Sequence, residues 1–200
     1  MVWLRIADEE LLKKIGAPER HPEGLFFPDT YRFSKGTTDT ALLRRAYKIM
    51  QSHLQAAWAE RDQTSPLTSA YDALVLASII EKETGRGEER GMVSAVFTNR
   101  LRIGMRLQAD PTVIYGVGAK FDGNLRRRDL QRDTPYNTYT RTGLPPTPIA
   151  MPSLASIRAA VQPAQSDVLY FVAQRDGSSK FSKTLDEHNQ AVARFLRQGG

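Results

Sequence analysis

The chain has no cysteine among its 200 residues. This absence excludes disulfide bridges, thiolate metal sites and cysteine nucleophiles, although it says little about the compartment. Only three histidines are present, His21, His53 and His188, and they lack the paired spacing that zinc requires. A glycine-rich phosphate-binding loop is missing too. We therefore expect neither a metal nor another cofactor.

Long apolar runs are also absent. No segment approaches eighteen consecutive apolar residues, and the N-terminus lacks a signal-peptide pattern. We expect either a cytoplasmic protein or a soluble part of something larger. The remaining composition, 40% hydrophobic and 25% charged, is typical of one globular core. A net charge of +6 makes an anionic partner plausible, whether nucleic acid, polysaccharide or membrane surface.

One apolar segment ends in a carboxylate. The spacing predicts a helix over 71–84, with Ser65-Pro66 as its start signal and Gly85 as its left-handed end. Apolar residues cover all its faces, which is typical of a buried helix. We expect Glu81 to lie in or beside the core, where burial and the negative helix end raise its pKa.

A protonated carboxyl near neutral pH can serve as a general acid. The alternative is a structural carboxylate that pairs with Lys82 or with an arginine elsewhere. Glu83 points nearly opposite to Glu81 on the same helix and is expected to be structural.

The other elements follow from periodicity, caps and turn residues. Predicted helices cover 4–15, 39–61 and 88–103, a short one begins at Ser153 before Pro163, and a capping box at Thr184 opens the last, which runs to Arg197. A buried strand is predicted over 168–173, followed by an Asp176-Gly177 turn and a second strand over 180–183. The fold class is therefore α+β: mostly helical, with a buried central helix, a long ordered loop over 105–151 and a small C-terminal antiparallel hairpin followed by a helix.

The long loop contains side chains suited to sugar binding. Aromatic faces stack on sugar rings, while amides and hydroxyls reach ring substituents. Gln108, Asp110 and Thr112 supply such polar groups, and so does the run 136–139. Because serine nucleophiles lack a partner here, carboxylates and this loop point to glycosidase-like chemistry. The alternative is that these polar residues merely stabilise turns, and Arg126-Arg127-Arg128 is more typical of a solvated charge cluster.

Several longer motifs resemble one known family. They are Pro22-Glu23-Gly24 with Phe27-Pro28-Asp29-Thr30-Tyr31, Ala77-Ser78-Ile79-Ile80-Glu81-Lys82-Glu83-Thr84, Val96-Phe97-Thr98-Asn99-Arg100-Leu101, the run 104–116, Tyr136-Asn137-Thr138-Tyr139, Gly143-Leu144-Pro145-Pro146 and Glu187-His188-Asn189. In this order, from about residue 20 onward, they resemble the YceG-like (MltG) endolytic murein transglycosylases.

The resemblance implies a lyase that cleaves the β-1,4 bond between N-acetylmuramic acid and N-acetylglucosamine. The muramic 6-hydroxyl, and not water, attacks and leaves a 1,6-anhydro end. The resemblance identifies Glu81 as the catalytic residue, acting as acid and then as base. It implies a substrate-binding set of Glu23, Asn99, Gln108, Asp110, Thr112, Tyr115, Tyr136, Asn137, Thr138, Tyr139, Leu144 and Pro145.

The resemblance also implies a larger protein. Residues 1–35 are expected to be a segment that connects to a LysM-like subdomain, and 36–200 the catalytic domain. The intact protein is expected at the periplasmic face of the cytoplasmic membrane, held by one span that this chain lacks. Expected partners are peptidoglycan glycan strands and, for the intact protein, peptidoglycan synthases, but no nucleic acid.

Two alternatives stay open. One is a muramidase-type hydrolase in which Asp110 or Glu83 is a second carboxylate. The other is a non-catalytic module that binds anionic glycan or nucleic acid through its basic surface.

Overall fold

The computed structural model describes residues 8–18 and 21–197. The described elements are α1 (Asp8–Ile15), α2 (Asp39–Ala59), α3 (Ala70–Glu83), the 3₁₀ turn η1 (Gly87–Glu89), α4 (Arg90–Arg102), α5 (Asp110–Val117), the 3₁₀ turn η2 (Gly118–Lys120), α6 (Arg127–Gln131), α7 (Leu154–Val161), β1 (Tyr170–Ala173), β2 (Ser179–Ser182) and α8 (Leu185–Arg197). Half of the chain is helical and the sheet has two strands, so the predicted α+β class is confirmed.

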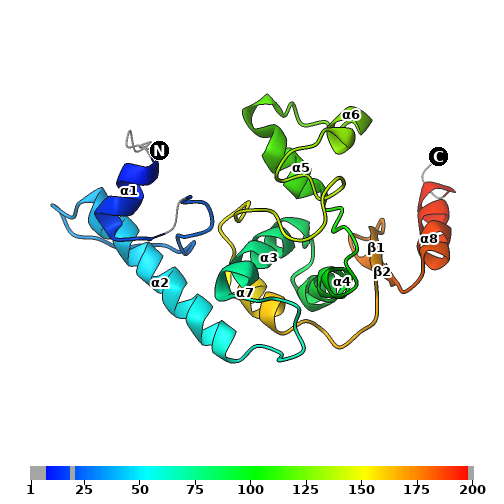
Figure 1. Ribbon diagram of the computed structural model, residues 1–200, viewed down its shortest axis with the longest axis horizontal. Helices are drawn as coiled ribbons and strands as arrows, with labels where there is room; N and C mark the ends of the chain where they lie inside the picture. The colour runs from blue at the N-terminus through cyan, green and yellow to red at the C-terminus, as the bar shows by residue number, and fades with distance from the viewer. Residues whose placement is uncertain (1–7, 19–20, 198–200) are drawn as a thin grey trace.

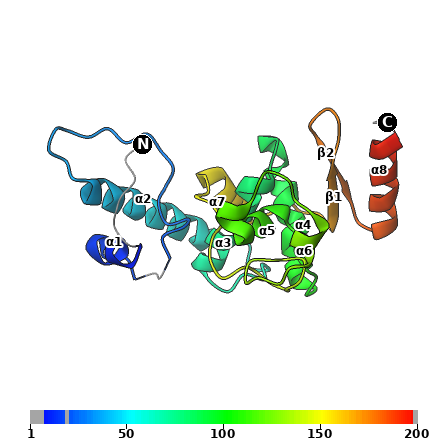
Figure 2. The same ribbon diagram turned by 90° about the horizontal axis from the view of Figure 1, so that it is seen from above.

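Helix α3 forms the centre of the molecule. All its residues from Ala73 to Ile80 are buried, as its all-round apolar sequence predicts. It packs most extensively on α7 and also contacts α2, α4 and α5. Figures 1 and 2 show α1 and α2 on one side of this centre, and the hairpin with α8 on the other.

The ends of α3 differ from the predicted signals. The helix begins at Ser69, whose side chain accepts from the Asp72 amide while Asp72 caps in return, and not at Ser65-Pro66. It ends at Thr84 in an extended conformation, with the Thr84 amide and hydroxyl both donating to the Ile80 carbonyl, at 3.0 and 2.7 Å. Gly85 has no left-handed backbone, so that part of the prediction was wrong.

The N-terminal segment packs on α2 and reaches toward the centre. Leu11, Leu12 and Ile15 of α1 are buried, whereas residues 4–7 of the helix predicted over 4–15 lie outside the described residues. Gly24 has a φ of +79°, and a Cβ there would lie 2.4 Å from the Pro148 Cβ. The backbone of the 22–25 turn therefore presses directly on the segment before α7.

The segment 105–151 is less irregular than predicted. It contains α5 and α6, which stand above α3 and α4 in Figure 1. With eight and five residues, these helices are too short to show a clear helical period in the sequence. The rest of the segment is an ordered coil.

The C-terminal hairpin has the predicted turn and an antiparallel register that pairs Tyr170 with Ser182 and Ala173 with Ser179. Strand β1 is half-buried, so the prediction of a buried strand was wrong. One side of the hairpin meets α4 through an edge-to-face contact of Phe97 and Phe171, but the other side meets α8, which has no buried residue. The predicted capping box of α8 is confirmed by reciprocal hydrogen bonds between Thr184 and Glu187.

Candidate active site

The last turn of α3 carries two carboxylates, Glu81 and Glu83. Two residues correspond to about 200° around a helix, so the two side chains leave α3 on opposite sides. Glu81 contacts the start of α7, and Glu83 faces Asp110 of α5 and Arg100 of α4. The two carboxyl groups therefore lie in different environments.

Glu81 is held by the N-terminus of α7. Its Oε2 accepts from the Ser153 amide at 3.0 Å, the Ser153 hydroxyl at 2.6 Å and the Ser156 hydroxyl at 2.6 Å. Partial burial alone would raise its pKa, but the hydrogen bonds from Ser153 and Ser156 outweigh burial, and the pKa of Glu81 is lowered. The predicted raised pKa of Glu81 was wrong, because the donors that keep it ionised lie more than 70 residues along the chain.

The surroundings of Glu83 shift its pKa in the opposite direction. Burial, reinforced by the negative charge of Asp110, raises the pKa of Glu83 to about 7, and the positive charge of Arg100 only partly offsets these effects. The raised pKa favours the protonated form of Glu83 relative to an ordinary carboxyl near neutral pH. The residue as a whole is half-buried.

A buried arginine stands close to Glu83. The Arg100 Nε donates to the Leu169 carbonyl at 2.7 Å and a terminal nitrogen donates to the Leu107 carbonyl at 2.6 Å. The guanidinium also lies 5.3 Å from the Tyr170 ring centroid. Sequence reasoning missed Arg100 as a site residue, although it lies within one of the quoted motifs.

The C-terminal unit adds a further aromatic contact. His188 of α8 stacks on Tyr170 with ring centroids 5.3 Å apart, and the Tyr170 ring faces Arg100. Neither Tyr170 nor His188 was among the predicted site residues. The motif Glu187-His188-Asn189 was the available signal for His188, but nothing in the sequence placed it near α4.

Two of the predicted substrate-binding residues meet beside Glu83. The Tyr139 hydroxyl donates to the Asp110 carboxylate at 2.5 Å, and burial together with this hydrogen bond raises the pKa of Tyr139. Gln108 has a φ of +50°, the one left-handed backbone among the described non-glycine residues, and its amide donates to the Thr138 carbonyl. A strained conformation of this kind is often found at functional sites.

Three further predicted residues form a second group. The rings of Tyr115 and Tyr136 lie 4.7 Å apart, and the Tyr136 and Thr147 hydroxyls share a hydrogen bond of 2.8 Å. Burial and the neighbouring carboxylate of Glu23 raise the pKa of Tyr115. The Glu23 turn, α5 and the 136–147 loop therefore converge here.

The other predicted binding residues are occupied within the protein. The Asn99 side chain donates to the carbonyls of Ser166 and Val168, and the Thr112 and Thr138 hydroxyls bond each other at 2.8 Å. The remaining three are Asn137, which is buried and donates to three carbonyls, Leu144, which packs on the core, and Pro145, which is buried. These six residues shape the site and offer few free polar groups to a ligand.

A cavity of about 770 Å³ lies elsewhere, between the hairpin and α8, and neither Glu81 nor Glu83 lines it. Within residues 8–18 and 21–197, no group of three or more histidine, aspartate or glutamate side chains is arranged to hold a metal. The chemistry available near α3 is therefore that of a carboxyl with a raised pKa, a neighbouring carboxylate and a buried cation.

The profile of the YceG-like family matches residues 4–194. The chain belongs to the YceG-like family. It is 38% identical over 179 residues to the endolytic murein transglycosylase of Bacillus subtilis (strain 168), a match that covers 88% of this chain and 49% of the relative. The endolytic murein transglycosylase of Streptococcus pneumoniae serotype 2 (strain D39 / NCTC 7466) is 32% identical over 180 residues, covering 87% and 32%.

The fold agrees with the sequence match. A 2.6 Å crystal structure of a YceG-like protein from Listeria monocytogenes, lmo1499, superposes with a TM-score of 0.75 at 36% identity, and the match covers 90% of this chain and 62% of that one. The chain thus spans about half or less of the length of these curated relatives. Within the part of the chain that the structure describes, no helix is both long and apolar enough to cross a membrane.

Proposed function

We propose that this YceG-like chain is the catalytic part of an endolytic peptidoglycan lytic transglycosylase. The names of the relatives support murein as the substrate. The observation that carries the proposal is the position of Glu83 at the end of α3, beside Asp110, its partner Tyr139 and the Arg100 cation, where burial and the Asp110 charge raise its pKa to about 7 and favour proton donation at neutral pH.

Glu83 fits the role of general acid better than Glu81. Three hydrogen bonds converge on one oxygen of Glu81 and favour its ionised form, so this side chain is a poor proton donor near pH 7. Glu83 lies instead where Asp110, Tyr139 and Arg100 come together. The assignment of Glu81 from the family resemblance stays a prediction, and a matched pair of variants decides between the two.

The proposed reaction uses one carboxyl twice. Protonated Glu83 gives its proton to the glycosidic oxygen as the bond to the muramic C1 breaks, and the N-acetylglucosamine hydroxyl leaves. The resulting carboxylate lies near the buried Arg100 cation, which stabilises its charge. It then takes the proton of the muramic 6-hydroxyl as that oxygen bonds to C1, which closes the 1,6-anhydro ring and restores the acid. General acid–base assistance of this kind accounts for about 10²–10⁴-fold of the rate.

The substrate contacts are proposed for the predicted residues whose side chains are not enclosed. They are Glu23, Gln108, Asp110, Tyr115, Tyr136 and Tyr139, which come from the 22–25 turn, the coil just before α5, α5 itself and the 136–147 loop. The flat Tyr rings suit sugar faces, and the Asp110 charge suits the positive character that develops at C1.

The second candidate function is that of a muramidase-type hydrolase. Its support is that Glu83 and Asp110 place two carboxyl groups in one site, the pair that hydrolysis by a glycosidase requires. Mass spectrometry of digested peptidoglycan separates the two functions, because hydrolysis gives reducing ends that are one water heavier than anhydro ends.

The test is product analysis with wild-type protein beside Glu83→Gln. We expect anhydro-muropeptides from internal cleavage by the wild type, released about 10²–10⁴-fold more slowly by the variant. Reducing ends in their place would establish the hydrolase, and tight glycan binding without any new chain ends would establish a binding module.

We further propose that the intact protein works at the periplasmic face of the cytoplasmic membrane, anchored by a single span, and acts beside peptidoglycan synthases. The division into a connecting segment over 1–35 and a catalytic domain over 36–200 belongs to the same proposal. The support for these points is the family resemblance and the greater length of the relatives.

A further inference from the structure

The segment 118–132, here called the basic lobe, projects from the body of the protein. It follows α5, contains α6 and stands above the α3–α4 centre in Figure 1. None of its residues is buried. The lobe therefore contributes little to the core, and its sequence is not explained by packing.

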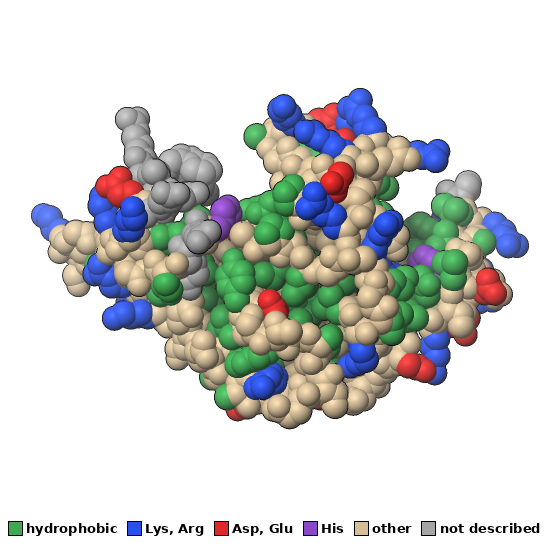
Figure 3. All heavy atoms as spheres, viewed as in Figure 1, with side chains coloured by type: hydrophobic (Ala, Val, Ile, Leu, Met, Phe, Trp, Pro, Cys, Tyr) green, Lys and Arg blue, Asp and Glu red, His purple; other side chains and the backbone are tan. Residues whose placement is uncertain are grey.

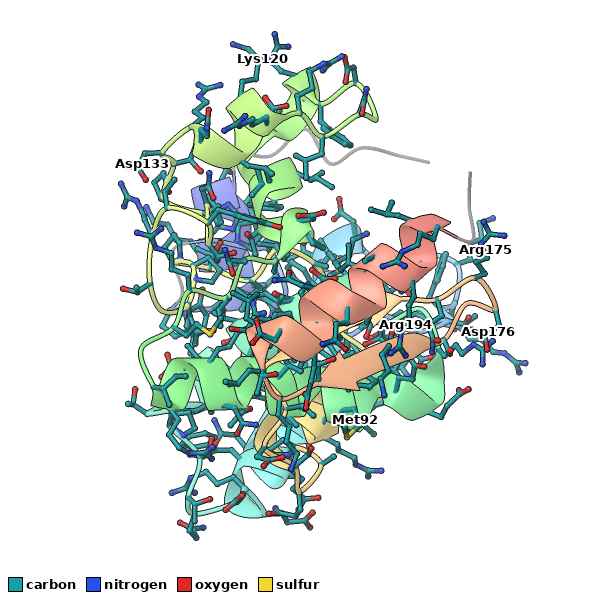
Figure 4. The ribbon with its side chains drawn as sticks, turned by 90° about the vertical axis from the view of Figure 1, so that its right-hand side faces the viewer. Met92, Lys120, Asp133, Arg175, Asp176 and Arg194 are labelled. Carbon is teal, nitrogen blue, oxygen red and sulfur yellow. The ribbon has the colours of Figure 1, made fainter. Side chains whose placement is uncertain are left out.

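The basic lobe carries an excess of positive charge. Five lysine or arginine residues stand against two aspartates, which leaves a net charge of +3, half of the +6 of the whole chain. In Figure 3 the corresponding Lys and Arg side chains gather at the top of the view, and Figure 4 places Lys120 at the outer end of the lobe.

Much of this charge has no internal partner. Both terminal nitrogens of Arg126 donate to the Asp122 carboxylate, at 3.0 and 2.7 Å, and the Asp129 carboxylate accepts from the Arg126 amide. Among the described residues, no carboxylate lies within ion-pair distance of Lys120, Arg127 or Arg132, and Arg128 reaches Asp129 only at 3.8 Å. One cavity of about 360 Å³ is lined by four of the cations, Lys120, Arg126, Arg128 and Arg132, together with Asp122 and Asp129, so positive charge is in excess around it.

The lobe is also held in a fixed position relative to the site. The buried Asn137 amide donates to the carbonyls of Asp129, Leu130 and Arg132, at 3.3, 3.0 and 2.7 Å. Asn137 immediately precedes Thr138 and Tyr139, and the Tyr139 hydroxyl bonds Asp110 beside Glu83. The side chains of Arg127 and Arg128 are exposed, as expected of a solvated charge cluster, while Asn137 fixes the backbone of the lobe relative to the site.

We propose that the basic lobe binds the carboxylates of the peptide stems carried by the glycan strand being cleaved. Guanidinium and ammonium groups around a small cavity match carboxylate oxygens in charge and hydrogen-bonding geometry. Helix α5, about 12 Å long, separates the lobe from Asp110. An extended peptide stem spans up to about 3.5 Å per residue, so a stem of four or five residues is long enough to reach the lobe from a muramic unit in the site.

This inference rests on the proposed function and specifies which strands the site prefers. The test compares steady-state kinetics on uncrosslinked strands with peptide stems and on the same strands after an amidase has removed the stems. The variant is Lys120→Gln with Arg128→Gln and Arg132→Gln. A matched control, Lys13→Gln with Lys35→Gln and Lys48→Gln, removes the same charge from exposed positions near α1 and α2.

We expect the lobe variant to raise KM about tenfold on stem-bearing strands, with kcat unchanged and stem-free kinetics equal to those of the wild type. The control variant should differ from wild type on neither substrate, and added salt should reduce the advantage of stem-bearing strands. An equal change on both substrates, or no change on either, would overturn the proposal.

Failure of the proposed function gives a different result. In that case wild-type protein produces no new chain ends on either substrate. Co-sedimentation of the same proteins with stem-bearing and stem-free strands then decides the role of the lobe, since stem-dependent binding lost only in the lobe variant would support it and equal binding would overturn it.

Discussion

Glu81 and Glu83 belong to one helical turn, yet their surroundings have opposite effects on the same chemical group. Glu81 meets the N-terminus of α7, where an amide and two hydroxyls stabilise the anion. Burial and the carboxylate of Asp110 stabilise the acid form of Glu83, and the Arg100 cation only partly offsets them. The helix therefore sets the direction in which each carboxyl points, and the neighbouring elements on each side decide whether its ionised or its protonated form is favoured.

The largest expected effect concerns turnover. Glu83→Gln should lower kcat by about 10²–10⁴-fold, because the amide cannot donate the proton that the leaving oxygen needs. Glu81→Gln should stay within about tenfold of the wild type, since its amide oxygen can still accept from Ser153 and Ser156. The measurement is release of soluble muropeptides from sacculi, with circular dichroism to verify folding.

The converse ranking of these two variants would move the catalytic role back to Glu81. Equal and complete loss of turnover in both variants would indicate that the two carboxyls act as one unit, and that their different surroundings do not give them different roles.

The second effect is an opposite dependence of stability on pH. The folded-state pKa of Glu83, about 7, lies above its ordinary value of 4.5, so its contribution is full below pH 4.5 and is lost as pH rises through 7. The lowered pKa of Glu81 makes its contribution present above pH 4.5 and lost as pH falls through the folded-state value. Relative to wild type, Glu83→Gln should therefore gain up to about 3 kcal/mol of unfolding free energy between pH 5 and pH 8.

Urea denaturation at the two pH values measures this difference. Because the Glu83 residue is half-buried and not fully buried, about 3 kcal/mol is an upper value. If the difference in unfolding free energy between wild type and Glu83→Gln does not change with pH, Glu83 titrates normally.

A third and smaller effect separates the structural roles. Glu81→Ala should lower the unfolding free energy by about 2 kcal/mol, because the Ser156 hydroxyl, which is 0% exposed, would lose its acceptor. For a protein of this size that corresponds to about 4–8 °C in Tm. Thermal unfolding at pH 7 measures it, and an unchanged Tm would show that the contact with α7 contributes nothing.

The smallest effect tests the neighbour of Glu83. Asp110→Asn removes a like charge, so the pKa of Glu83 should fall and the basic limb of the kcat/KM profile should move to lower pH by up to about one unit. Asp133→Asn, which alters an exposed aspartate paired with Arg141, serves as the control and should leave the limb in place. A profile that does not move in Asp110→Asn would leave burial as the sole cause of the raised pKa.

The sequence correctly predicted those features of the fold that depend on residues close to one another in the chain. The burial of α3, the hairpin turn at Asp176-Gly177 and the capping box at Thr184 each depend on residues within a few positions of one another. Helix phase also separated Glu81 from Glu83. The roles assigned to them could not come from phase, because Ser153 and Ser156 lie 72 and 75 residues after Glu81 and act only through the tertiary fold.

The pairing of α3 with α7 also has a consequence for synthesis of the chain. The extensive contact of these two helices joins segments about 70 residues apart, and α3 emerges first. Since synthesis adds about 5–20 residues per second, roughly 4–16 s pass between the completion of the apolar α3 and that of α7, which covers it. Contacts so distant in sequence also slow folding, since a long loop must close before they form. A nascent chain that stalls before Val161 therefore presents the apolar surface of α3 to chaperones and proteases.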